Sequence, residues 1–130
     1  MNKINNYLKT GYETIDREHR IWIASVNSII EALEKEKGKD ELRKNILFLI
    51  LFTIKHFSAE EDTMLTHNYS EYSTHKNYHE KFKMTLLGLA HQLQKKDSSE
   101  GFTDNVVFNI RDWMIYHINN HDFKMAAYIK

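Results

Sequence analysis

Apolar and polar positions alternate along the chain with the period of an α-helix. In four successive segments, apolar residues recur at steps of three and four, which places them on one face of a helix. Gly38 is expected to end the first helix, Asp40 to be the N-cap of the second and Ser70 the N-cap of the third. The pattern therefore predicts four helices with short connections, over residues of about 15–37, 42–67, 72–93 and 103–117.

Short connections make consecutive helices antiparallel neighbours. We therefore expect an all-α fold, an up-down-up-down antiparallel four-helix bundle whose apolar stripes face a common core. Composition agrees, since the 130 residues include four Gly and no Pro, too few turn residues for a many-stranded β fold. The length suggests a single domain over residues 1–130.

Charge and cysteine content remove several classes of protein. The 18 basic and 18 acidic residues cancel, so no net charge attracts nucleic acid or an anionic membrane. The absence of cysteine excludes disulfides, thiolate metal sites and iron–sulfur clusters. The longest apolar run, residues 46–54, is far shorter than the roughly 20 residues that cross a bilayer, and the N-terminus lacks an apolar signal core. We expect a cytoplasmic protein with no nucleic-acid partner and no membrane insertion.

Histidines occupy several positions on the predicted core stripes. Six of the eight do so: His19, His56, His75, His79 and His117, and also His67, which lies where the second stripe ends. Glu60 lies on the second stripe, four residues after His56, and this spacing stacks two side chains on one helix face. Ionisable side chains are rarely buried unless they are paired or bound to a metal. These stripes therefore predict a polar cluster inside an apolar core.

The connectivity of the bundle brings these side chains to one end. His19 lies near the start of the first helix, Glu60 near the end of the second and His75 near the start of the third. In an up-down-up-down bundle these three helix ends meet with the end of the fourth helix, where His117 lies. Asp122 is about 140° around an ideal helix from His117, so it faces inward only if the fourth helix bends or ends there.

Such a cluster has the chemistry of a metal site. Imidazole suits iron, zinc, copper and nickel, and a carboxylate can bridge two cations. Five histidines with two carboxylates exceed the needs of one tetrahedral zinc but suit two metals. A single histidine on a core stripe is more often a hydrogen-bonded structural residue, but five converging ones favour ligands. We expect His67, His91 and His121 to be bystanders, and Glu61 and Asp62 to be surface acids.

The role of Asp16 is open at this point. It lies three residues before His19, so it either caps the first helix or orients that histidine through its second nitrogen. The position at the start of a helix favours the first role.

Five segments resemble the hemerythrin family, in particular the single-domain bacterial hemerythrins (bacteriohemerythrins). They are IDREH (15–19), HFSAEEDTM (56–64), HKNYHEKF (75–82), WMIYHI (113–118) and HDFK (121–124). The resemblance implies a non-haem di-iron centre that binds dioxygen reversibly, with two iron ions per chain. It implies that three histidines hold one iron, two hold the other, and two carboxylates bridge the irons together with an oxo or hydroxo group. The residues at the matching positions are His75, His79 and His117 for the first iron, His19 and His56 for the second, and Glu60 and Asp122 for the bridges.

The resemblance implies oxygen storage, delivery or buffering, with dioxygen bound at the open position of the iron that has only two histidines. We expect Trp113, Met114 and Ile118 to line the apolar end of that pocket, with Met114 where the family more often has leucine. The donor set favours an oxygen-binding protein over an enzyme, because five neutral imidazoles favour the ferrous state.

Two alternatives on the same site remain open. One is a di-iron enzyme that reduces peroxide or nitric oxide. The other is an oxygen or iron sensor module, which is less favoured because no output domain precedes the end at Lys130. The sequence indicates no particular protein partner.

Overall fold

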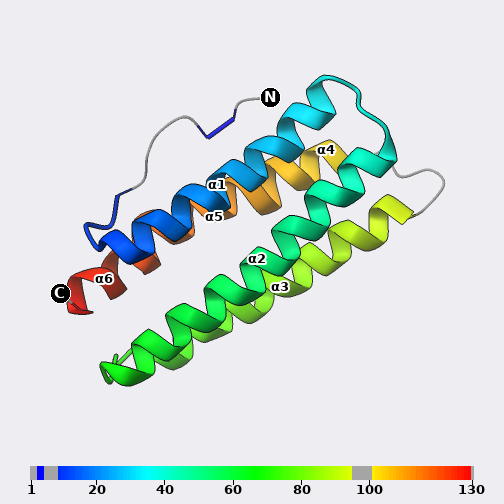
Figure 1. Ribbon diagram of the computed structural model, residues 1–130. Helices are drawn as coiled ribbons and strands as arrows, with labels where there is room; N and C mark the ends of the chain where they lie inside the picture. The colour runs from blue at the N-terminus through cyan, green and yellow to red at the C-terminus, as the bar shows by residue number, and fades with distance from the viewer. Residues whose placement is uncertain (1–2, 5–8, 95–100, 130) are drawn as a thin grey trace.

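Four antiparallel helical arms form the bundle that the apolar stripes predict (Figure 1). The computed structural model describes residues 3–4, 9–94 and 101–129, and no strand occurs among them. The first three arms are α1 (Glu13–Glu34), α2 (Lys39–Thr66) and α3 (Tyr72–Gln94). The fourth arm comprises α4 (Phe102–Asp104), η1 (Asn105–Arg111), α5 (Asp112–His117), η2 (Ile118–Asp122) and α6 (Phe123–Ile129). The prediction of an all-α up-down-up-down bundle is confirmed.

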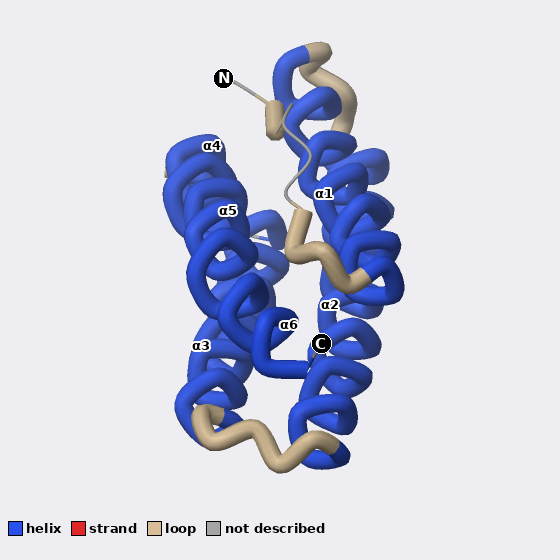
Figure 2. The backbone as a smooth tube through the Cα atoms, turned by 90° about the vertical axis from the view of Figure 1, so that its left-hand side faces the viewer, coloured by secondary structure: helices blue, strands red, loops and turns tan. Residues whose placement is uncertain are grey.

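The arms pair in the order of the chain. Figure 2 shows α1 beside α2 on one side of the bundle, and α3 beside the fourth arm on the other. The start of α1, the end of α2, the start of α3 and the end of the fourth arm meet at the left-hand end in Figure 1. This is the end at which connectivity places the histidines. No helix in the described ranges is long and apolar enough to span a membrane.

The start of the second helix differs slightly from the prediction. Gly38, with an extended backbone, is the N-cap of α2. Asp40 is therefore not the N-cap, and lies instead in the first turn, where a negative charge interacts favourably with the helix dipole. Asn68 closes the turn after α2 with φ 53°, a left-handed conformation that asparagine tolerates better than most residues.

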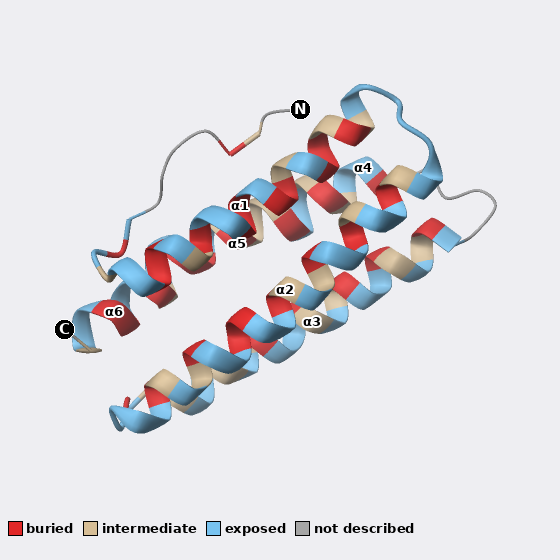
Figure 3. Ribbon diagram, viewed as in Figure 1, coloured by how far each residue is buried: buried red, intermediate tan, exposed pale blue. Residues whose placement is uncertain are grey.

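Two apolar clusters enclose the region between them. Buried residues face inward on every arm (Figure 3), and the larger cluster includes Trp22, Leu49 and Leu89. A smaller one closes the end of the bundle with Ile15, Met64, Tyr69, Met125 and Ala126. The predicted polar cluster lies where these two apolar regions meet: His19 falls between Ile15 and Trp22, and Glu60 falls between Phe57 and Met64.

Asp16 holds the chain before α1 in place. Its Oδ1 accepts hydrogen bonds from the backbone nitrogen of Thr10 at 2.8 Å and from the Thr10 hydroxyl at 2.6 Å. Its Oδ2 accepts a third from the backbone nitrogen of Gly11 at 3.1 Å. Burial raises the pKa of this carboxyl, but the three hydrogen bonds outweigh burial and lower it below its ordinary value. Asp16 therefore serves the start of α1 and does not hydrogen-bond His19.

Candidate metal centre

The structure brings the seven predicted ligands together in one buried volume. Each is at most 3% exposed. They come from all four arms: His19 from α1, His56 and Glu60 from α2, His75 and His79 from α3, and His117 and Asp122 from the fourth arm. Their donor atoms form two groups, and within each group all of these atoms lie within 4.8 Å of one another. The predicted bystanders His67 and His91 are exposed and lie outside both groups.

A π-helical segment turns Asp122 inward. The α-helical spacing required the fourth helix to bend or end at this point, but the helix continues through η2 instead. A π-helix closes i→i+5 hydrogen bonds, so residues five apart fall near the same face. His117 Nε2 consequently lies 3.1 Å from Asp122 Oδ1. Sequence spacing alone gave no sign of this segment, because its backbone conformation is set by packing in the folded chain.

The two carboxylates divide their oxygens between the two groups. Asp122 Oδ2 lies 2.9 Å from His19 Nε2, and Glu60 Oε2 lies 3.0 Å from His56 Nε2. The other oxygens face the second group, with Asp122 Oδ1 3.0 Å from His75 Nε2. Glu60 Oε1 lies 3.3 Å from His79 Nε2. Each carboxylate therefore lies between a group with two imidazoles and a group with three.

The nitrogen and oxygen atoms that face into the cluster lack hydrogen-bond partners. All five Nε2 atoms and all four carboxylate oxygens are buried without one in the described part of the chain. Unsatisfied buried polar atoms are costly, and so many in one place call for a bound group. Imidazole nitrogens and carboxylate oxygens are the donors that a pair of first-row transition metals accepts. The residues therefore fit a di-metal centre.

Charge within the cluster opposes the cost of burial. Burial lowers the pKa values of His19, His56 and His75, but the adjacent carboxylates outweigh it and raise them to about 9, 10 and 9. Burial likewise raises the pKa of Glu60 and of Asp122, and the surrounding histidines bring both well below their ordinary values. Protonated His19, His56 and His75 would offset the charge of the two carboxylates, and a metal ion bound here would have to displace these protons.

Two carboxylates contact the outer nitrogens of the ligands. Glu61 Oε2 lies 2.9 Å from His79 Nδ1. Glu18 Oε1 makes a longer contact of 3.5 Å with His56 Nδ1. A carboxylate that accepts the Nδ1 proton leaves Nε2 free to bind a metal and fixes the orientation of the ring. The prediction that Glu61 is a surface acid is wrong, since its side chain is only 13% exposed.

A second imidazole contacts the outer nitrogen of His117. The Nδ1 atoms of His117 and His121 lie 3.1 Å apart, so one of them donates and the other accepts. The ring of His121 stacks on Tyr78 with ring centres 4.2 Å apart. Burial lowers the pKa values of both histidines. His121 is therefore not a bystander. The sequence signal for this contact was its position four residues after His117 on the fourth helix.

Aromatic rings pack against the ligands from the core side. Phe57 stacks on His79 with ring centres 3.7 Å apart, and Trp113 stacks on His117 at 4.5 Å. Trp22 lies 5.2 Å from the His56 ring, and its indole nitrogen donates to the Thr53 hydroxyl at 2.9 Å. The helical stripes predicted Trp22 and Trp113 as ordinary core residues, without their contacts to the site, and did not include Phe57.

The three residues expected to line an oxygen pocket differ in how deeply they are buried and in what they contact. Met114 and Ile118 are buried in the larger apolar cluster, which also contains Trp22. Trp113 is only partly buried and packs between His117 and Phe82. Its stacking places it beside the group with three imidazoles. A pocket role for the three residues stays a prediction.

A small pocket between α1 and α2 reaches the group with two imidazoles. Its volume is about 70 Å³, and its lining includes Tyr12, Glu18, His56 and Glu60. Since one water occupies about 30 Å³ of liquid, this space suits a molecule of a few atoms. A smaller pocket of about 20 Å³ lies beside the other group, with His75 and His121 in its lining, so the larger of the two spaces adjoins the group with two imidazoles.

Comparisons with known proteins agree with this geometry. The family model of the hemerythrin HHE cation binding domain matches residues 10–129. The chain is 33% identical to a hemerythrin of Sipunculus nudus over 87% of its own length and 81% of the relative. It is 31% identical to myohemerythrin of the same organism (89% and 83%) and 30% identical to bacteriohemerythrin of Methylococcus capsulatus (82% and 79%). The chain belongs to the hemerythrin family, as its motifs predicted.

Proposed function

We propose that the chain binds dioxygen reversibly at a non-haem di-iron centre and so stores, delivers or buffers oxygen. Family membership implies a non-haem di-iron domain. Reversible oxygen binding by this chain is the further step proposed here. When bound, the two irons supply the electron pair that dioxygen takes up on binding and returns on release.

The division of the carboxylate oxygens carries the proposal. Glu60 and Asp122 each direct one oxygen to the group with three imidazoles and one to the group with two. Carboxylates so placed would bridge two irons, with an oxo or hydroxo group as the third bridge. His75, His79 and His117 would hold one iron, and His19 and His56 the other. The smaller set of ligands leaves room for an exogenous molecule, and the small pocket opens at that set.

The donor set supports a carrier over an oxidase. Ferritin-like di-iron sites have about four Glu and two His, an anionic set that stabilises high oxidation states. Two carboxylates and five neutral imidazoles carry less negative charge and favour the ferrous state. The pocket of about 70 Å³ beside the group with two imidazoles has room for a ligand as small as dioxygen.

The surrounding residues control water at the site. Trp22, Phe57, Met114 and Ile118 are at most 1% exposed and form an apolar wall on the core side. An apolar wall limits access of solvent and protons, which slows loss of the ferrous state by oxidation. We infer that this wall favours release of intact oxygen over irreversible oxidation.

Repeated oxygenation tests the proposal. The chain is loaded with ferrous iron without air, its iron content is measured, and oxygen is admitted and removed over many cycles. We expect two irons per chain and a ligand-to-iron charge-transfer band that appears with oxygen and disappears on its removal. Rapid conversion to an inert ferric form, with sustained turnover of peroxide or nitric oxide, would favour an enzyme instead. One zinc per chain would overturn the metal assignment.

Two alanine variants on α3 separate ligands from other histidines. His75→Ala removes a proposed ligand and should prevent assembly of the iron pair. His91→Ala is the matched control, since His91 is exposed on the same helix and lies in neither donor group. Equal iron content in the two variants would contradict the assignment of His75.

A further inference from the structure

The outer side of α2 carries an unusual set of apolar residues. Inward-facing Ile46, Leu49 and Thr53 are buried, as expected for a bundle helix. The opposite side of the same stretch is also apolar and remains between 46% and 59% exposed, at Leu47, Phe48, Leu51 and Ile54. A helix that is apolar all round is normally covered on both sides. Within the described chain, nothing covers this second side.

The apolar surface extends from α2 onto α1. A groove between these helices is lined by Phe48 and by Ile21, which is 42% exposed. With about 200 Å² for each large apolar residue, the five half-exposed side chains offer roughly 500 Å². A standard interface takes about 800 Å² from each partner, of which roughly 65% is apolar in homodimers. The exposed apolar area is therefore close to the apolar share that one partner contributes to a standard interface.

Charges at the two ends of this surface are opposite in sign. Lys44 precedes the apolar residues on α2, and Asp62 follows them. They are eighteen residues apart, or about five full turns, so both lie on the same side of the helix, roughly 27 Å from each other. Both are exposed, and neither makes an ion pair with another described residue. The midpoint between them lies at the level of Leu51 and Ile54.

We propose that this outer face of α2 (Lys44, Leu47, Phe48, Leu51, Ile54 and Asp62) is the contact between two copies of this chain, packed antiparallel about a two-fold axis. In such an interface, a residue i that meets j implies that j also meets i. An antiparallel pair centred between Leu51 and Ile54 therefore places Lys44 of each copy opposite Asp62 of the other. A parallel pair would bring like charges together, so charge selects the antiparallel arrangement.

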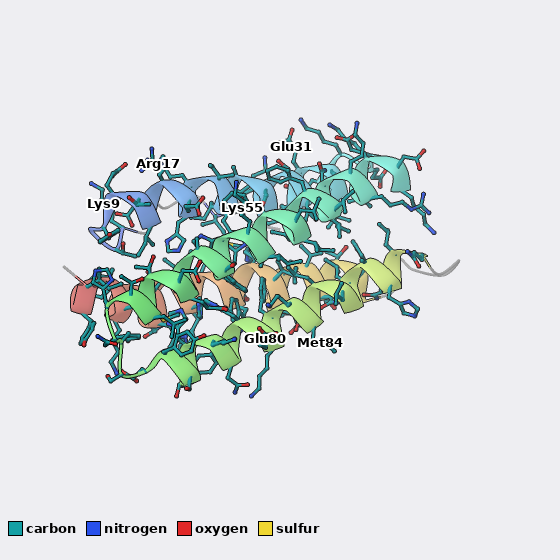
Figure 4. All side chains as sticks on the ribbon, turned by 60° about the horizontal axis from the view of Figure 1, so that its bottom comes forward. Lys9, Arg17, Glu31, Lys55, Glu80 and Met84 are labelled. Atoms are coloured by element: carbon teal, nitrogen blue, oxygen red, sulfur yellow. The ribbon has the colours of Figure 1, made fainter. Side chains whose placement is uncertain are left out.

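Charge also argues against a membrane as the occupant. An anionic lipid surface attracts faces whose flanking charges are all basic. Here Asp62 ends the face with a negative charge. Lys55, labelled in Figure 4, would lie near the two-fold axis. Its positive charge interacts with the negative charge of Glu18 on α1, so the charge of Lys55 is partly offset. The pattern fits a second copy of this chain better than a lipid surface.

Analytical ultracentrifugation of the iron-loaded full chain tests the dimer. At roughly 100 µM chain, where an interface with a Kd of about 10 µM is largely occupied, we expect twice the chain mass of 15.6 kDa. Leu51→Glu places a charge at the centre of the interface and should weaken dimerisation at least about thirtyfold. Phe108→Glu is the matched control, because Phe108 is also exposed but lies on η1, which packs against α1 and α3. It should dimerise like the unaltered chain.

A charge exchange tests the register without adding charge to the apolar centre. Lys44→Glu and Asp62→Lys should each weaken the dimer about three- to tenfold, and the double variant should recover most of the loss. A monomer at this concentration, a trimer or larger assembly, or a dimer unaffected by Leu51→Glu would overturn the proposal. A charge exchange without recovery would overturn the antiparallel register. A monomer that sediments with phosphatidylserine vesicles would assign the face to a membrane instead.

Discussion

The contact between Glu61 and His79 should set how tightly the site holds iron. Glu61 Oε2 lies 2.9 Å from His79 Nδ1, and its side chain is 13% exposed, so water screens the contact only partly. Carboxylates that orient ligating histidines typically contribute tenfold to a hundredfold in metal affinity. Glu61→Gln keeps an oxygen acceptor but removes the charge, so we expect about a tenfold loss, or about 1.4 kcal/mol. Glu61→Ala removes the acceptor as well and should approach the hundredfold limit.

Competition with a chelator of known affinity, carried out without air, measures this loss directly. Glu80→Gln is the matched control, because Glu80 is next to His79 in sequence but pairs with Lys83 at the surface. A change below about threefold in Glu61→Ala would refute the orienting role. An equal loss in the Glu80→Gln control would show that general charge near the site, and not the contact, determines affinity.

Three further predictions follow from burial and charge. The raised pKa values of His19, His56 and His75, about 9, 10 and 9 against an ordinary 6.5, stabilise the metal-free fold while these groups are protonated. Denaturant unfolding of the metal-free chain should therefore show stability falling from pH 7 to pH 9, while apparent iron affinity rises and protons are released on binding. Phe57→Ala removes a fully buried ring and should lower the free energy of unfolding by about 3–5 kcal/mol. Asp16→Asn removes the charge from three hydrogen bonds and should cost about 1–3 kcal/mol without changing iron content.

Each of these has an outcome that contradicts it. A metal-free chain that becomes more stable between pH 7 and pH 9 would contradict the protonated state of the histidines. A loss below about 1 kcal/mol in Phe57→Ala would mean that the site refills the space of the ring. Loss of iron from Asp16→Asn would assign Asp16 to the metal centre, contrary to its contacts with Thr10 and Gly11.

Helical periodicity accounts for most of the site. His19, His56, Glu60, His75 and His79 lie on stripes that the apolar residues define, so burying a stripe also buries its polar members. Connectivity then places them at one end of the bundle. Asp122 is different, because its orientation depends on the π-helical turn of η2. The motif resemblance found Asp122, whereas spacing argued against it.

Contacts at the margins of the helices could not be read from the pattern. Glu61 follows a core residue by one position, about 100° around the helix, where side chains reach either solvent or a neighbouring helix. The position of α3 decides between them and brings Glu61 to His79. The exposed apolar face of α2 could not be read from the pattern either. Residues 46–54 are almost continuously apolar, so the sequence does not show which side of the helix is buried.

The sequence by itself determined the four helical segments, their order around the core and, except for Asp122, which polar side chains join the buried cluster, because each depends on local spacing and short connections. Only the tertiary structure decided how the imidazole nitrogens and carboxylate oxygens divide between the two groups. The approach of all four arms sets which carboxylate oxygen faces His19 and His56 and which faces the three other imidazoles. Such distances depend on packing between residues far apart in the chain, and helical periodicity carries no information about them.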